Sequence, residues 1–225
     1  YDKPLAYFVY GEITDAFLVD PYEVVFHNKT PKDNAYFTQL GKLACEPRPL
    51  YTTPAAFYQE TQRGANRYLK SDELMDTVFY EIGAGSKGII YFNKIFSGGK
   101  GYHAMPGLEN AIGKLNLILQ TLKDYISNSE PMPLSKHVPN LDVSTLLCAD
   151  KGILILVRKL NHDEPKNNSL EIEIPEWMKL SHGFQMTLDG EQKIIHLSIS
   201  DHTVTLDVSA IDKWGIYFLA AKEAE

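Results

Sequence analysis

The chain has 225 residues, of which 44% are hydrophobic and 23% charged, a composition that excludes a disordered or collagen-like protein. Its 22 basic and 29 acidic side chains give a net charge of −7, so we expect no nucleic-acid partner and no binding to an anionic membrane. The longest apolar run, residues 152–157, is far shorter than the roughly 18 residues of a membrane span, and two cysteines are too few for a disulfide framework.

Strands and helices alternate in the first half of the chain. Short runs rich in β-branched and aromatic residues predict strands near residues 4–10, 15–22, 50–57 and 88–92. Apolar residues at helical spacing predict helices at residues 33–44, 71–82 and 108–126. Because strands that are joined by helices must lie parallel, with right-handed crossovers, this half predicts a parallel α/β sheet.

The second half has a different pattern. Residues 127–139 are polar and proline-rich without periodicity, which predicts a domain boundary. Beyond them come short strand-like runs near residues 144–147, 152–160, 170–174, 183–188, 193–199, 203–208 and 214–220. The pair Asp189-Gly190 is typical of a tight turn between two of these strands. Short strands without helical periodicity predict an antiparallel β-sandwich.

Several segments of the first half resemble parts of a known barrel. Residues 15–22 (DAFLVDPY) resemble the sixth strand, and residues 48–59 (RPLYTTPAAFYQ) the seventh strand, of (β/α)8 barrels in the glycoside hydrolase superfamily. Residues 83–92 (GAGSKGIIYF) are similar to the junction into the eighth strand, and residues 115–119 (LNLIL) to the last barrel helix. The family that these segments resemble is that of the β-galactosidase-like glycosidases of clan A, in which a β-sandwich usually follows the barrel.

The resemblance implies an α/β plus all-β fold in two domains. Residues 1–130 would form the C-terminal half of a (β/α)8 barrel, strands five to eight, and residues 140–225 a β-sandwich domain. Half a barrel has two unpaired parallel edges, which should not be stable alone. The expected polypeptide partner is therefore either the missing N-terminal half of the barrel or another copy of the chain. The resemblance also implies a carbohydrate substrate. A secreted or periplasmic location is compatible with the resemblance.

The function that the resemblance implies is hydrolysis of O-glycosidic bonds in oligo- or polysaccharides. This reaction uses paired carboxyl groups, and in the family one of them lies on the fourth strand, upstream of this chain. The alternative is a non-catalytic barrel scaffold that binds carbohydrate, with a structural β-sandwich. We expect no cofactor and no metal, since no phosphate-loop pattern is present and the seven histidines lack ligand spacing.

Two glutamates follow predicted strand ends, where barrel enzymes place their chemistry. In the resembled family the nucleophile lies at the end of the seventh strand, and Glu60 is the nearest match to that position. Gln59 could be the inward-facing residue instead, with Glu60 a solvated loop carboxylate. Glu12, which follows the first predicted strand, is the second catalytic candidate.

Other residues at the same strand ends are candidates for binding a sugar, because aromatic planes stack on the C–H faces of sugar rings and polar groups bond the hydroxyls. The substrate-binding candidates are Asp20, Tyr22, Tyr58, Gln59, Phe92, Asn93 and Lys94. Each has a structural alternative: Asp20 can fix the turn before Pro21, the rings can pack in the core, and Asn93 and Lys94 can be a capping or surface pair. His103, after a glycine-rich loop, could be a general acid or a hydroxyl donor, although a lone loop histidine is usually neither.

Overall fold

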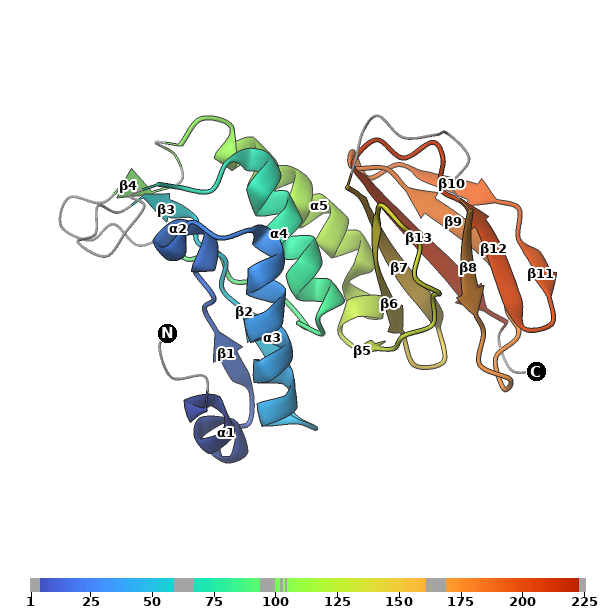
Figure 1. Cartoon of the computed structure of the whole chain (residues 1–225), viewed down its shortest axis with the longest axis horizontal. Coiled ribbons are helices and arrows are strands. Elements are labelled where there is room, and N and C mark those ends of the chain that lie inside the picture. Colours follow the sequence, from blue (N-terminus) through green and yellow to red (C-terminus); the bar gives the residue numbers. More distant parts are fainter. Residues whose placement is uncertain are drawn as a thin grey trace. The chain divides into compact units, whose positions relative to one another are not determined.

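The computed structural model of the chain describes residues 5–58, 67–93, 100–101, 103, 105–160 and 169–222. The chain divides into two compact units, Tyr1–Ser127 and Asn128–Glu225. Figure 1 shows helices and short strands in the first unit and long antiparallel strands in the second.

The first unit is built on three parallel extended segments. Strand β1 (Phe17–Val19) pairs in parallel with β2 (Leu50–Thr52). Two parallel bridges, Thr52–Ile89 and Ala55–Phe92, add residues 89–92 on the other side of β2. The spatial order of the segments therefore follows their order in the chain, as expected for parallel strands with crossover helices.

Helices connect these segments in the chain. Helices α2 (Glu23–His27) and α3 (Pro31–Cys45) lie between β1 and β2, α4 (Ser71–Gly83) precedes residues 89–92, and α5 (Leu108–Ile126) follows them. The predicted helices at 33–44, 71–82 and 108–126 are thereby confirmed. Strand β3 (Phe57–Tyr58) pairs antiparallel with β4 (Lys100–Gly101), which joins the chain after β2 to the chain before α5.

One face of the parallel sheet packs against the helices. Phe17, Val19 and Leu50 form a buried cluster with Cys45 of α3. Leu18 lies between two of these residues on β1 and is 52% exposed. Because successive side chains of a strand point to opposite faces, Leu18 marks the face that the helices leave open.

The segment predicted as the first strand, residues 4–10, is helical, so that prediction is wrong. It forms α1 (Ala6–Tyr10), continued by the 3-10 turn η1 (Gly11–Ile13). Tyr7 packs edge-on against Phe17, with ring centroids 5.7 Å apart, and Gly11 lies against the backbone of Ala44. Aromatic and β-branched residues favour strands only in a suitable sheet context, and here contacts with α3 and β1 stabilise a helix. The described residues thus hold three parallel segments rather than four, and they do not close a barrel.

The second unit consists of two antiparallel sheets. In its described part, one sheet has six strands in the order β10-β9-β13-β7-β6-β5, and the other has three in the order β11-β12-β8. The strands are β5 (Glu130–Pro131), β6 (Leu141–Leu147), β7 (Gly152–Lys159), β8 (Ser169–Glu173), β9 (Leu180–Met186), β10 (Gln192–Ile195), β11 (Ser198–Ser200), β12 (Thr203–Asp207) and β13 (Trp214–Ala221). The predicted turn between β9 and β10 is present, and Gly190 adopts a φ of 84° there.

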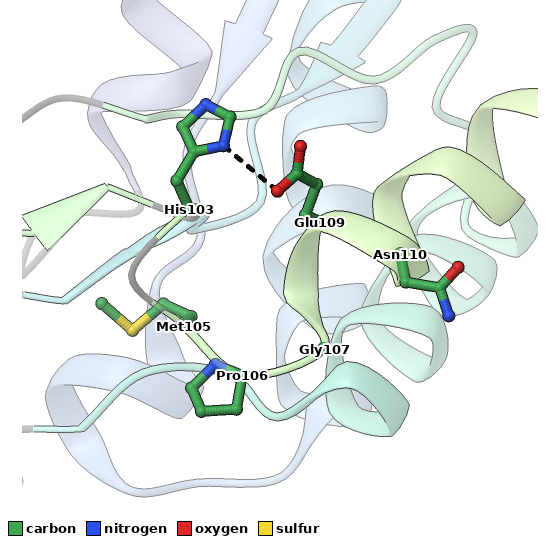
Figure 2. Close-up of a pocket in the computed structure, with 6 residues that line it drawn as sticks. All are labelled: His103, Met105, Pro106, Gly107, Glu109 and Asn110. Carbon is green, nitrogen blue, oxygen red and sulfur yellow. Dashed lines mark hydrogen bonds and ion pairs between the residues drawn. The ribbon is translucent and has the colours of Figure 1, made fainter.

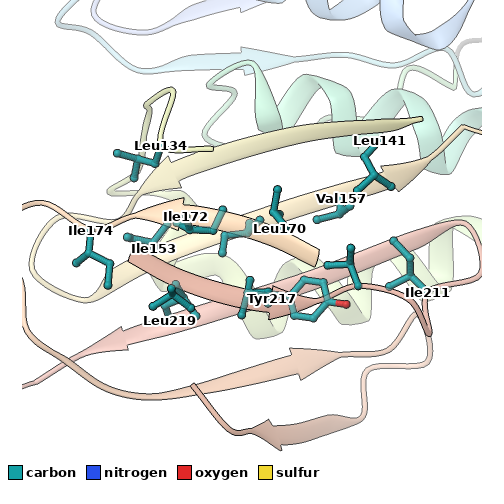
Figure 3. Packing of buried hydrophobic residues seen from close by; sticks show 14 of the residues in the cluster. Leu134, Leu141, Ile153, Val157, Leu170, Ile172, Ile174, Ile211, Tyr217 and Leu219 are labelled. Atoms are coloured by element: carbon teal, nitrogen blue, oxygen red, sulfur yellow. The ribbon is translucent and has the colours of Figure 1, made fainter. Parts of the chain in front are cut away.

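Apolar side chains of both sheets share one core. Figure 3 shows Ile153 of β7 and Leu219 of β13 packing with Leu170 and Ile172 of β8, and all four are buried. The two sheets therefore form an antiparallel β-sandwich, as the short strands predict.

Candidate functional site

The carboxyl ends of the three parallel segments define the candidate site. Asp20 and Tyr22 follow β1, Phe57 follows β2, and Phe92 and Asn93 end the third segment. In α/β proteins ligands bind at this edge, because the loops that follow the strands converge there.

Four aromatic side chains pack together at this edge and form what we name the aromatic cluster, Tyr22, Phe26, Phe57 and Phe92. The ring centroid of Tyr22 lies 5.5 Å from that of Phe57 and 5.9 Å from that of Phe92. Tyr22 is 4% exposed and Phe57 is 1% exposed, whereas Phe92 is only partly buried. The two buried rings contact each other, so their main role is to hold the strand ends together.

Asp20 and Tyr22 differ in exposure. Asp20 is exposed to solvent, which suits a group that hydrogen-bonds a ligand. Burial raises the pKa of the Tyr22 hydroxyl well above its ordinary value, and the negative charges of Asp20 and Glu81 raise it further. Tyr22 therefore keeps its proton throughout the neutral range and does not act as a base.

A close contact joins the third segment to β4. A Cβ added to Gly101 would approach Oδ1 of Asn93 to 2.5 Å, so a larger residue there would displace the Asn93 amide. Gly101 pairs with Phe57 in the β3–β4 ladder. The exposed Asn93 amide is thus held near the chain that follows β2, where it can hydrogen-bond a ligand.

Several candidates cannot be placed in this site. Gln59, Glu60 and Lys94 lie outside the described residues, and for Tyr58 the structure gives the backbone position on β3. The predicted nucleophile, Glu60, follows β3 by two residues in the chain.

The other catalytic candidate, Glu12, lies at the opposite edge of the sheet. It is exposed on η1, which precedes β1. The guanidinium of Arg48, just before β2, donates to the carbonyl of Gly11 at 3.3 Å, which places η1 beside the amino ends of both strands. Figure 1 shows α1 and α2 at opposite ends of β1. The structure brings Asp20, Tyr22, Phe92 and Asn93 to one edge and keeps Glu12 at the other.

An open hollow of about 570 Å³ lies where α5 begins. It is lined by His103, Met105, Pro106, Gly107, Glu109 and Asn110. Figure 2 shows the imidazole of His103 turned toward the Glu109 carboxylate, with Nδ1 3.3 Å from Oε2. The side chains are 65% and 70% exposed, so the pair contributes little to stability, but both groups are open to a ligand. The sequence interpretation of His103 as a lone histidine missed this pairing.

Sequence reasoning also missed a buried polar cluster between α3, α4 and β2. Glu81 of α4 is fully buried, and Nδ2 of Asn34 donates to its Oε1 at 3.3 Å. The hydroxyls of Thr52 and Ser86 are hydrogen-bonded at 3.0 Å beside it. Among the described residues, Oε2 of Glu81 and Oδ1 of Asn34 have no hydrogen-bond partner.

Burial controls the ionisation of Glu81. Desolvation raises its pKa to about 8, and hydrogen bonds from Thr52 and Asn34 offset only part of that rise. Glu81 also affects two tyrosines. In its ionised form its negative charge adds to the rise in the pKa of Tyr22 and of Tyr91. Because Glu81 is closed to solvent, it is a structural group rather than a ligand-binding one.

Metal and membrane features are absent from the described part of the chain. No group of three or more His, Cys, Asp and Glu side chains there is placed to hold a metal ion. No helix in the same residues has the length and apolar character needed to cross a bilayer.

Comparison with known proteins shows similarity of fold. No protein-family model matches the sequence, and no curated protein matches it. The structure is similar to that of the GH51 arabinofuranosidase from Xanthomonas axonopodis pv. citri, with a TM-score of 0.51 and 8% sequence identity. The match covers 97% of this chain and 56% of that enzyme, so the chain spans little more than half of its length. The chain combines helices with antiparallel sheets, in a fold similar to that of this enzyme.

Proposed function

We propose that the chain is the carboxyl-terminal part of a glycoside hydrolase that cleaves O-glycosidic bonds of oligo- or polysaccharides. One observation supports this above the others: Asp20, Phe92 and Asn93 gather at the carboxyl edge of parallel segments, in a fold similar to that of an arabinofuranosidase. Residues 1–130 would supply half of a barrel, strands six to eight among them, and residues 140–225 its β-sandwich.

Each residue has a role in this proposal. Glu60, which follows β3 in the chain, supplies one of the two carboxyl groups that glycoside hydrolysis needs, and the second comes from outside the chain. Asp20 and Asn93 hydrogen-bond sugar hydroxyls, and Tyr58, Gln59 and Lys94 are the further substrate-binding residues of the proposal. Tyr22 supports the site through the aromatic cluster. Glu12, at the opposite edge, takes no part.

The test is hydrolysis of nitrophenyl glycosides, with the α-L-arabinofuranoside first, by the chain and by any longer reading frame that contains it. We expect Glu60→Gln to lower kcat by at least about 100-fold, the scale of a lost acid–base or nucleophilic carboxylate. Glu176→Gln, at an exposed glutamate between β8 and β9, is the matched control and should keep full activity. Undiminished turnover in Glu60→Gln, with the fold intact by circular dichroism, would remove Glu60 from the mechanism.

A second function is a non-catalytic scaffold that binds carbohydrate, and the separation of Asp20 and Glu12 favours it. These two exposed carboxylates lie at opposite edges of the sheet, so they do not form the carboxyl pair that glycoside hydrolysis needs. Calorimetric binding of arabino-oligosaccharides that is weakened by Asn93→Ala, without hydrolysis by either form of the protein, would favour this function over the first.

A further inference from the structure

The hollow at the start of α5 is lined by a turn that the surrounding structure holds in place. Gly107 caps the helix with a φ of 75°, and a Cβ added to it would approach the Ser71 hydroxyl to 2.7 Å, so a larger residue would be both strained and crowded. The N–H of Leu108 donates to the carbonyl of Met105 at 3.2 Å and closes the turn, and Met105 is 5% exposed. The wall of the hollow is therefore formed without a ligand, as is usual for small-molecule sites.

Polar and apolar groups line different parts of the hollow. In Figure 2 the imidazole of His103 and the carboxylate of Glu109 face each other, the thioether of Met105 and the ring of Pro106 lie apart from this pair, and the amide of Asn110 points away from it. The paired side chains are 65% and 70% exposed. One part of the hollow thus offers hydrogen bonds to a ligand, and the other offers an apolar surface.

The chemistry of the hollow favours a neutral ligand with several hydroxyl groups. The Glu109 carboxylate and the net charge of −7 repel an anion, whereas a neutral ligand is not repelled. A carboxylate accepts from two hydroxyls at once, and an imidazole donates or accepts. The volume of about 570 Å³ lies in the usual range of ligand pockets, roughly 300–1,000 Å³. A sugar unit has this size and combines hydroxyls with apolar C–H groups, which the Pro106 ring can contact.

The hollow also lies close to the carboxyl edge of the parallel segments. Gly101 lies against the Asn93 amide, one of the sugar-binding groups of the proposed function. His103 follows Gly101 by two residues, so the Cα atoms of the two are at most about 7 Å apart. An oligosaccharide, unlike a single sugar, is long enough to contact both Asn93 and the hollow.

We infer that the hollow is a second sugar-binding position, in which Glu109 and His103 hydrogen-bond the hydroxyls of one unit of an oligosaccharide whose neighbouring unit lies at the Asp20 and Asn93 edge. The inference deepens the proposed function and rests on it for the kind of ligand. The exposed pair contributes little to stability, so its substitution changes binding while the fold stays intact.

The test is a titration of the isotope-labelled chain with arabinose and with arabinotriose, followed by nuclear magnetic resonance. The amide signals of residues 107–110 should shift with arabinotriose, and the triose should bind at least about tenfold more tightly than arabinose, because it gains the hydrogen bonds of the hollow. Glu109→Gln should raise the Kd of the triose about tenfold and His103→Ala about threefold, the scale of a charged and of a neutral hydrogen bond.

Two controls accompany these variants. The Kd of arabinose should stay within about twofold in Glu109→Gln, because the single sugar binds at the carboxyl edge. Glu176→Gln, which removes an exposed carboxylate outside the hollow, should leave the Kd of both ligands within about twofold of the unaltered chain. Circular dichroism verifies that each variant is folded.

The inference is overturned if the Kd of the triose is unchanged in Glu109→Gln, if both ligands lose affinity equally, or if the signals of residues 107–110 do not shift. Should arabinotriose not bind, xylotriose and galactotriose are titrated next, and failure of all three also overturns it. The measurement is independent of hydrolysis. Binding at the hollow without cleavage of any nitrophenyl glycoside would count against the proposed function alone, and cleavage of arabinotriose with an unchanged KM in Glu109→Gln would count against the inference alone.

Discussion

Glu81 is a carboxyl group that the folded chain holds in its neutral form. The group is fully buried on α4, and the amide of Asn34 donates to one of its oxygens. Burial raises its pKa from an ordinary value of 4.5 to about 8. The folded chain therefore binds a proton that the unfolded chain releases above pH 4.5, and this difference makes the stability of the first unit depend on pH.

The sign of this dependence is fixed by the direction of the shift. Because the pKa is higher in the folded state, the free energy of unfolding should fall as pH rises from about 4.5 to about 8, by about 1.4 kcal/mol per pH unit at most. Glu81→Gln cannot ionise and keeps an acceptor for Asn34, so the variant should lack this fall and be the more stable form at pH 8. Urea unfolding at several pH values measures the difference.

The exposed Glu12→Gln variant is the matched control, and its pH profile should follow that of the unaltered chain. A profile for Glu81→Gln that runs parallel to the unaltered chain between pH 5 and pH 8 would contradict the assignment of a neutral buried carboxyl.

The sequence predicts residues at the edge of the sheet better than it predicts their surroundings. Tyr22, Phe92 and Asn93 follow apolar runs, so their gathering at the strand ends could be foreseen. That the Tyr22 ring is buried against Phe57 could not, because ring contacts depend on packing between segments far apart in the chain. The burial of Glu81 could have been predicted from helical spacing. Glu81 lies seven residues after Leu74 and three after Val78, which places it on the same buried side of α4.

Among the elements, α3 shows how local chemistry fixes a helix start. Pro31 occupies its first position, and the Asp33 carboxylate accepts from the Thr30 N–H at 2.8 Å and from the Thr30 hydroxyl at 2.7 Å. These bonds satisfy groups that the helix start would otherwise leave unpaired. They also lower the pKa of Asp33 below its ordinary value of 3.8.

Loss of this cap should be measurable. Asp33→Ala should reduce the free energy of unfolding by about 1 kcal/mol at neutral pH, whereas Gln39→Ala, at an exposed interior position of α3, should change it little. Because the pKa of Asp33 is lowered in the folded state, its contribution is present above pH 3.8 and is lost as pH falls below it. A difference between Asp33→Ala and the unaltered chain that persists unchanged to pH 2 would show that the carboxylate is not the stabilising group.

Helices were predicted correctly where a periodic pattern of apolar residues extends over many residues. The 19 residues of α5 hold a buried stripe over several turns, which no strand pattern imitates. Residues 4–10 form a short apolar run in which helix and strand cannot be distinguished by periodicity. The segment forms the helix α1 because Tyr7 packs against Phe17 and because Gly11 leaves space for the backbone of Ala44. Both contacts join residues far apart in the chain, so local sequence does not reveal them.

At the scale of the whole molecule, each unit has its own core. Phe17, Val19, Cys45 and Leu50 are buried together in the first unit, and a larger cluster that includes Ile155 is confined to the second. Separate cores are the usual basis for separate unfolding transitions. We propose that the two units unfold independently.

The tryptophans make this proposal testable, because the two that the chain contains, Trp177 and Trp214, both lie in the second unit. Ile155→Ala removes a fully buried side chain from the sandwich core and should destabilise that unit by about 2–5 kcal/mol, so the urea midpoint seen by tryptophan fluorescence should fall. The helical signal near 222 nm, which comes from helices of the first unit, should keep its midpoint. Leu50→Ala should give the reverse pattern, because Leu50 is buried in the first unit. If both substitutions shift both signals together, the chain unfolds as one cooperative body and the independence of the two cores is refuted.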